Sequence, residues 1–486
     1  MSKFNLIALA VAATLAAPSA FAITVVPTAT QTRVAHVDVE DDATVVSVGA
    51  IPVGIADTDL IIGRTVGFSV RIDLQGGAEF AAAPATVPVG SALQAGANWT
   101  ANLAAGGTAG DTFAVYSVQP AVGSTGVING PALNFAANSI AIQNVAGLGT
   151  AGGTVSATVT FADPGTAQPI LTPVSAVIVR SANPLAYDVA GGDTASKIDV
   201  GTTGAPSKTR FSPTGSIGGA TAANRFFDAG AASVGVVTGA GAVRAVNDAT
   251  AAFAWAAGDT VALTLAGTFN AFLATTPANG ASVTLVTAGT CAAPTTVING
   301  TVAAGGVTFP TSTAYSALGN GILCFTTPTN TTTQIDASGV ATSVTVRRTA
   351  TTKTASASDA ALPLVYNGPV VDVDHFNPAS NANQISYLRV INPSAAAGLV
   401  TISGVCDNGT AQAPVTLTLA AGNAVLLTAN DLATGAKGLS GAFTQCATGK
   451  SRLTVTGEFN GMKVQNFLRN VTADGGQINT NVNNQN

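Results

Sequence analysis

Two short acidic segments carry the residues whose types and spacing come closest to a chemical site. One spans residues 38–42, and the other spans residues 372–374. Calcium takes about six to eight oxygen ligands and prefers carboxylates, so acidic clusters at domain junctions can bind it and stiffen a chain. The alternative is two solvated acidic loops, because no EF-hand loop or glycine-aspartate nonapeptide repeat is present. The candidate calcium ligands are Asp38, Glu40, Asp41, Asp42, Asp372 and Asp374.

The sequence contains few candidate residues for acid–base or nucleophilic catalysis. His36 and His375 are the only imidazoles, and a hydrolase triad needs one beside a nucleophile and a carboxylate. The nearest approach to a nucleophile elbow is residues 214–218, which begin with threonine rather than glycine. We therefore expect both histidines to be surface or edge residues and the protein not to be an enzyme.

The sequence also contains few candidate residues for cleaving or binding carbohydrate. Glycosidases place two carboxyl groups across a cleft that is normally lined by aromatic side chains, and aromatic residues are only 5% of this chain. Trp255 lies in an apolar segment and is expected to pack in a core. Trp99 lies in a polar segment and is a candidate sugar platform, although ordinary packing is the alternative.

The four cysteines predict disulfides rather than metal ligands. No CxxC spacing occurs, and an even number of cysteines in an exported chain implies bridges, for which four cysteines allow three connectivities. We favour Cys291–Cys324 and Cys406–Cys446, because each pair then stays within one predicted domain. Each disulfide would stabilise the folded protein by about 3–4 kcal/mol, because it reduces the conformational entropy of the unfolded chain.

The first 22 residues predict export. Lys3 supplies a positive charge, residues 6–17 are apolar, and Ala20-Phe21-Ala22 is a small-x-small cleavage site. The apolar stretch is shorter than the roughly 20 residues of a transmembrane helix, and later apolar runs are interrupted. We expect cleavage after Ala22, no transmembrane span, and an extracellular or cell-surface location.

Composition favours an all-β fold. Hydrophobic residues make up 47% of the chain, which is enough to bury cores, and 53 glycines and 22 prolines supply turns. Glutamate and lysine, the usual surface helix formers, are scarce. Charged residues are only 9%, with a net charge of −5 and no basic patch, so nucleic acid is not an expected partner.

Alternating apolar and polar residues predict half-buried antiparallel strands, for example at residues 66–74 and 153–163. Repeated short strands with glycine and proline turns predict tandem antiparallel β-sandwich domains of the Ig-like or Greek-key type. Residues 350–363 are of low complexity and are interpreted as linker-like. The predicted parts are a signal peptide (1–22), a β-sandwich (23–200), a linker (201–223), a second β-rich domain (224–361), a C-terminal β-sandwich (364–478) and a disordered tail (479–486).

The C-terminal region has a recognisable order of motifs. "SYLRVINPSAAAGLVTISGVCDNGT" is followed by "VTLTLAAGNAVLLTANDL" and "SRLTVTGEFNGMKVQNFLRN". Residues 414–431 and 451–469 predict two hairpins, the second around Asn460-Gly461. This order resembles a β-sandwich module that recurs in bacterial secreted and cell-surface proteins. The resemblance implies an accessory or structural domain without catalytic residues.

The composition as a whole, acidic and rich in Ala, Gly, Thr and Val, resembles that of surface-layer (S-layer) proteins. We therefore expect an exported, non-catalytic structural protein of the cell surface that self-assembles as an S-layer or sheath and contacts other cell-surface components. The alternative is a secreted adhesin or carbohydrate-binding protein with a glycan ligand. No cofactor is expected apart from the candidate calcium.

Overall fold

The computed structural model describes most of the chain between residues 23 and 483. The described ranges are 23–25, 32–55, 67–84, 99–120, 131–201, 208–212, 225–273, 281–311, 320–329, 333–444, 446, 449–471 and 478–483. The predicted signal peptide lies outside them. Within these ranges, each helix is too short or too polar to reach across a lipid bilayer.

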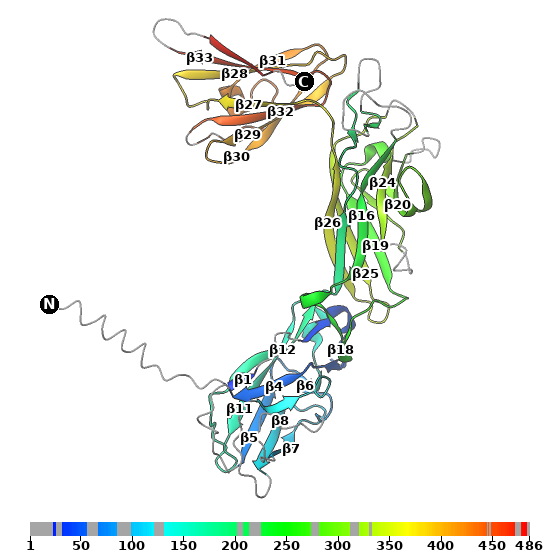
Figure 1. The fold of residues 1–486 in the computed structure, drawn as a ribbon, viewed down its shortest axis with the longest axis vertical. Coiled ribbons are helices and arrows are strands. Elements are labelled where there is room, and N and C mark those ends of the chain that lie inside the picture. The colour runs from blue at the N-terminus through cyan, green and yellow to red at the C-terminus, as the bar shows by residue number, and fades with distance from the viewer. Residues whose placement is uncertain are drawn as a thin grey trace, which may run out of the picture.

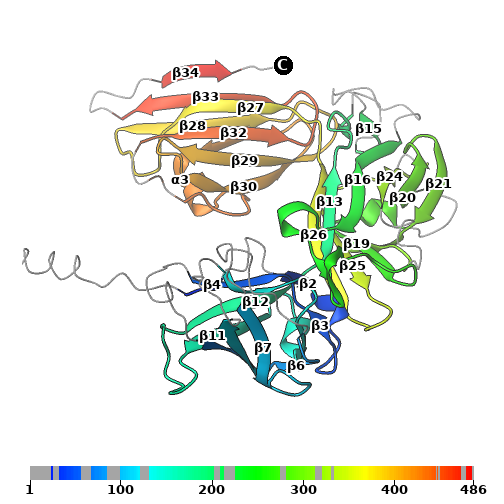
Figure 2. The same cartoon turned by 60° about the horizontal axis from the view of Figure 1, so that its bottom comes forward.

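The described chain is nearly all β, as composition and alternation predict. Its strands form several sheets, nearly all of whose strand pairs are antiparallel, around three large hydrophobic cores. The three corresponding lobes follow one another along the molecule, and the third is turned across the end of the second (Figure 1). Figure 2 shows the same order with the first lobe brought forward. The prediction of a multi-domain antiparallel β-protein is therefore confirmed.

The first domain is built around an eight-stranded sheet of order β18-β17-β2-β12-β11-β5-β8-β7. Strand β5 shows why it forms, because Phe68, Val70 and Ile72 point into the core and alternate with less buried residues. Two three-stranded sheets complete the domain, of order β1-β4-β9 and β3-β10-β6. The elements are β1 (Ile23–Val25), β2 (Thr32–Ala35), η1 (His36–Asp38), β3 (Val46–Ser47), β4 (Ile51–Ile55), β5 (Phe68–Leu74), β6 (Glu79–Phe80), β7 (Trp99–Gly106), β8 (Phe113–Pro120), β9 (Pro131–Phe135), β10 (Ala141–Gln143), η2 (Ala146–Gly149), β11 (Thr154–Ala162) and β12 (Val174–Ala182).

The second domain packs two five-stranded sheets, of order β13-β16-β24-β20-β21 and β22-β23-β19-β25-β26, with a two-stranded pair β14-β15. Phe325 lies at the centre of its core, where its ring contacts those of Phe227, Phe269 and Phe272 at centroid distances of 6.2, 5.6 and 5.2 Å. The elements are β13 (Leu185–Ala190), β14 (Lys197–Ile198), β15 (Phe211–Ser212), β16 (Phe226–Val236), η3 (Gly239–Gly241), β17 (Arg244–Ala245), β18 (Asp248–Ala252), β19 (Thr260–Ala266), η4 (Asn270–Phe272), β20 (Ser282–Gly289), β21 (Pro294–Asn299), β22 (Thr301–Ala303), β23 (Gly306–Thr308), β24 (Asn320–Thr326), β25 (Ser338–Arg347) and β26 (Thr354–Leu364), of which β17 and β18 join the first domain's sheet.

The third domain is a sandwich of two four-stranded sheets, β27-β32-β29-β30 and β31-β28-β33-β34. Its short α-helix α3 begins with a capping box, in which Thr428 and Asp431 bond to each other's backbone N–H, and ends at Gly435 with φ +69°. The elements are β27 (Val370–Phe376), β28 (Gln384–Ile391), β29 (Gly398–Cys406), β30 (Ala411–Leu419), β31 (Ala424–Thr428), α3 (Ala429–Thr434), β32 (Ser451–Gly457), β33 (Lys463–Asn470) and β34 (Ile478–Asn483).

Both predicted hairpins of the third domain are wrong. Strands β30 and β31 lie in opposite sheets of the sandwich, and so do β32 and β33. The turn at Asn460-Gly461, where Gly461 has φ +70°, carries the chain from one sheet to the other. Buried Asn392 supports a similar crossing, because its amide donates to the carbonyls of Ala396, Leu419 and Ala420. A tight turn in this domain therefore shows that the chain reverses direction, but it does not show that the two flanking strands pair with each other.

Three segments that were predicted to be irregular are ordered. Residues 354–364 form strand β26, paired along its length with β25. Within the predicted linker, residues 209–212 are buried, and Phe211 belongs to the second core. Within the predicted tail, residues 479–483 belong to strand β34, which pairs with β33. The second core also includes Leu185 and Val37, so it extends into the range predicted for the first domain.

Candidate functional sites: the acidic segments and the domain junctions

The first acidic segment divides into three separate environments. Asp38 Oδ1 lies 2.8 Å from Nε of Arg348, across the junction with the second domain. Asp41 accepts from the backbone N–H of Ala43 within its own exposed turn, at 3.0 Å. Asp42 Oδ1 accepts from the N–H of Ala146 at 3.1 Å, while Glu40 is exposed. These carboxylates serve different contacts.

The second acidic segment lies on β27. Asp372 and Asp374 are both exposed and share a face by the two-residue period of the strand. Asp372 Oδ1 accepts from the hydroxyl of Thr454 at 2.8 Å. Among the residues that the structure describes, no three His, Cys, Asp or Glu side chains gather in a group that could hold a metal ion. Calcium binding by these residues stays a prediction.

Arg348 organises the junction between the first two domains. It follows β25, and its guanidinium lies between Asp38 of the first domain and Asp259 of the second, with Nη1 2.9 Å from Asp259 Oδ2. The Asp259 side chain is 0% exposed, and it also accepts from the N–H groups of Ala256 and Thr349 at 2.7 and 2.9 Å. Burial raises the pKa of Asp38, an effect that outweighs the lowering by Arg348. One cation thus balances two carboxylates.

His36 strengthens the same junction. It is only 8% exposed, so the prediction of a surface or edge histidine is wrong. Its Nδ1 lies 3.0 Å from the carbonyl oxygen of Ala182, and its Nε2 lies 3.2 Å from that of Thr354. Each ring nitrogen therefore lies within hydrogen-bonding distance of a backbone carbonyl oxygen. The Thr351 hydroxyl donates to the Val37 carbonyl beside it. The ring therefore connects the first domain to β26.

A second ion pair spans the junction between the second and third domains. Lys208 Nζ lies 2.8 Å from Glu458 Oε2, and both side chains are largely buried. The same ammonium lies 4.7 Å from the centre of the Tyr366 ring, a cation–π distance. Burial, followed by the charge of Glu458, raises the pKa of Tyr366 to about 12. At Gly368 the chain passes so close to Gly457 that an added Cβ would lie 1.7 Å from its carbonyl oxygen.

Replacing Lys208 with methionine is expected to loosen the third domain. The change removes a hydrogen bond between charged groups, a loss of about 1.5–3 kcal/mol, and leaves Glu458 without its cation. Small-angle X-ray scattering should show a broader distribution of interatomic distances. Lys463→Met is the matched control, since Lys463 is exposed on β33. An unchanged distribution in Lys208→Met would show that the pair does not fix the junction.

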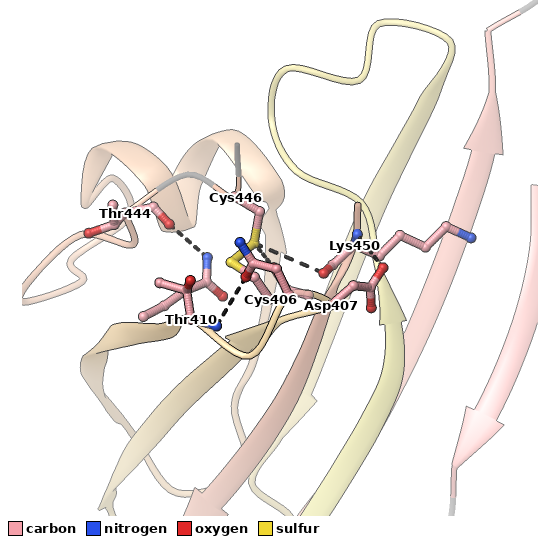
Figure 3. The surroundings of a disulfide bond; sticks show 9 residues. Cys406, Asp407, Thr410, Thr444, Cys446 and Lys450 are labelled. Carbon is pink, nitrogen blue, oxygen red and sulfur yellow. Dashed lines mark hydrogen bonds between the residues drawn. A yellow bond between two sulfur atoms is a disulfide. The ribbon is translucent and has the colours of Figure 1, made fainter. Parts of the chain in front are cut away.

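The structure contains both disulfides with the favoured pairing. Cys291 is bonded to Cys324 and Cys406 to Cys446, at sequence separations of 33 and 40 residues. The second bond closes a loop that is also held by Asp407, whose carboxylate accepts from the N–H of Lys450 at 2.8 Å (Figure 3). Each bond therefore lies within one β-domain.

The remaining aromatic and imidazole candidates are Trp255, Trp99 and His375. Trp255 packs against the second core and edge-on to Phe253, at a centroid distance of 4.9 Å. Trp99 begins β7, and its side chain is outside the described residues. His375 is exposed on β27. Sequence reasoning missed Arg348 and Lys208, whose partners are distant in sequence.

Comparison with known proteins found similarity in solved structures alone. No protein-family model matches the chain, and no curated protein matches it. The major pilin subunit BcpA of Bacillus cereus is similar over 85% of this chain and 94% of its own, with 8% identity and a TM-score of 0.22. Dimeric latent PorU from Porphyromonas gingivalis is similar over 89% of this chain and 31% of its own, with 10% identity and a TM-score of 0.12. At these TM-scores the likenesses support no inference about function.

Proposed function

We propose that this chain is an exported, non-catalytic structural protein of the bacterial cell surface that self-assembles through its β-domains. The observation that carries the proposal is an uncharged, exposed sheet edge in the second domain. Strand β21 is the last strand of its sheet, and five of its six residues are exposed. Val297, near its middle, is 41% exposed. An edge strand offers unpaired N–H and C=O groups to another chain.

The sequence around this edge has no charged residue to oppose pairing with another chain. Between Asp259 and Asp336 there is no Asp, Glu, Lys, Arg or His. Strand β22, which follows β21 after Gly300, is in turn the last strand of the opposite sheet. Natural sheets protect exposed edges with lysine, proline or bulges, and here only Pro294 and an irregular register serve that purpose. We infer that another copy of the chain covers this edge.

Three further features support the proposal. The domain junctions are held by ion pairs with partly or fully buried side chains, which suits a subunit that transmits force or keeps a fixed shape. Several carboxyl groups with a shifted pKa, such as Asp111 and Asp431, have partners within their own turn or cap. Their electrostatics stabilise local structure. Two disulfides are typical of an oxidising, exported location.

Negative-stain electron microscopy of the purified mature protein tests the proposal. We expect ordered sheets or filaments from the unmodified protein and their loss in Val297→Lys, because a lysine on an edge strand opposes pairing. Val45→Lys is the matched control, since Val45 is an exposed valine of the first domain. Assemblies that dissolve in chelator would also support calcium binding by the acidic segments. Monomers with and without calcium would contradict self-assembly and favour the adhesin alternative.

A further inference from the structure

A small pocket in the first domain's largest sheet carries two arginines and no acidic residue. Its volume is about 190 Å³, and it is lined by Thr32, Arg33, Arg244 and seven glycine or alanine residues. This is smaller than the roughly 300–1,000 Å³ of a drug-sized site. The pocket therefore suits one small ligand or one terminal group of a larger ligand.

The pocket exists because the sheet is incomplete at this point. Strand β17 is only two residues long and pairs in parallel with β2 at Val34 alone. Beside Thr32 and Arg33 the chain forms the short turn η3 in place of a strand. A Cβ added at Gly241 would lie 3.7 Å from Nη1 of Arg33, so this guanidinium extends over η3. The small residues of the lining leave space that larger side chains would fill.

The polar groups of the pocket are donors. Arg244 Nη1 donates to the carbonyl of Thr250 at 3.1 Å, which fixes the guanidinium and leaves its other N–H groups for a ligand. Thr32 Oγ1 accepts from the N–H of Gly49 at 2.7 Å, so its own hydrogen remains to be donated. Within the described part of the chain, no ion pair neutralises Arg33 or Arg244.

Asp248 is the acidic residue closest in sequence to the lining, and hydrogen bonds from residues beside the lining hold its carboxylate. It accepts from Nδ2 of Asn138 at 2.8 Å and from the backbone N–H of Thr250, also at 2.8 Å. Hydrogen bonds from Thr250 and Asn138 lower the pKa of Asp248 to about 2, so it stays charged without pairing with the arginines.

We propose that this pocket binds a small carboxylate, such as the acid group of a sugar. Guanidinium groups present planar pairs of N–H donors that match a carboxylate, and the hydroxyl of Thr32 adds a third donor. The glycine and alanine walls let the ligand approach closely, and no acidic residue lines the pocket. This inference does not depend on the proposed self-assembly.

Isothermal titration calorimetry of the mature protein tests the site, with sodium glucuronate, sodium acetate and glucose as probes at low ionic strength. We expect millimolar binding of glucuronate and none of glucose. Arg33→Met and Arg244→Met should each weaken the binding of glucuronate by about tenfold or more, the usual loss for hydrogen bonds to a charged group. Arg180→Met is the control, because Arg180 is Arg33's neighbour on β12 and does not line the pocket.

The outcomes separate the sources of the carboxylate. Glucuronate binding more tightly than acetate supports an acidic sugar, and equal affinities support a free carboxylate at the same site. Ala50→Glu should abolish binding of both by placing a competing carboxylate in the pocket, and circular dichroism establishes that each variant is folded. Absence of binding by both acids, or equal weakening by Arg180→Met, would overturn the proposal.

Discussion

Replacing Arg348 with methionine is expected to lower the free energy of unfolding by about 3–5 kcal/mol, the usual cost of breaking a buried ion pair from one side. The loss leaves Asp259, which is 0% exposed, and Asp38 without their shared cation. Two N–H groups still bond to Asp259, but they do not neutralise its charge. Urea unfolding at pH 7 measures the effect.

Arg347→Met is the matched control for this experiment. Arg347 is the preceding residue, ends β25 and is exposed, so its removal should change stability by less than about 0.5 kcal/mol. A similar small change in Arg348→Met would show that the two carboxylates do not need the guanidinium. Asp38→Asn in the Arg348→Met background should restore part of the stability, since it removes one of the unpaired charges.

The stability of Arg348→Met has a predictable pH dependence. Burial raises the pKa of Asp38, and a carboxyl group whose folded-state pKa exceeds its unfolded value is disfavoured when ionised. Its penalty is therefore present at neutral pH and is relieved as the pH falls through the folded-state value. Without Arg348 this penalty grows. The loss of unfolding free energy in Arg348→Met, relative to the unmodified protein, should therefore be smaller near pH 4 than at pH 7.

The local pattern of the sequence predicts which segments become strands. Alternation at residues 66–74 corresponds to β5, and alternation at 153–163 corresponds to β11. The class of the fold follows from the sum of such segments and from the turn residues between them. These properties depend on each residue's immediate neighbours along the chain, which the sequence provides directly.

Strand pairing does not follow from the same information. In the third domain, β32 and β33 flank Asn460-Gly461 and yet lie in different sheets, because the sandwich needs connections between its layers. Strand β26 was missed for a related reason. Its alanine-rich and serine-containing sequence resembles a linker, and only its pairing with β25 and its packing against β13 explain why it is ordered.

The junction residues were the least predictable from sequence. Arg347 and Arg348 are adjacent and of one type, but the second alone meets two carboxylates. Asp38 was identified as a candidate calcium ligand because of its acidic neighbours, whereas its contact in the structure is an arginine more than 300 positions away along the chain. The identity of such a partner is a property of domain packing.

Removing the disulfide between Cys406 and Cys446 by a double serine substitution is expected to destabilise the third domain by about 3–4 kcal/mol. The bond joins cysteines 40 residues apart. Without it the unfolded chain gains conformational entropy, which lowers the stability of the folded domain. Backbone contacts at Asp407 and Lys450 remain, but they do not restrict the unfolded state (Figure 3). Differential scanning calorimetry should show a lower transition temperature for this domain.

The matched control is the double serine variant of Cys291 and Cys324, whose disulfide closes a loop of similar length in the second domain. Because the second and third domains have separate cores, each variant should lower only its own domain's transition. If both transitions shifted together in either variant, the Lys208–Glu458 junction would couple the two domains into one cooperative unit. Independent transitions would instead mean that each sandwich holds its own shape, and that the ion pairs at the junctions set only how the domains are arranged.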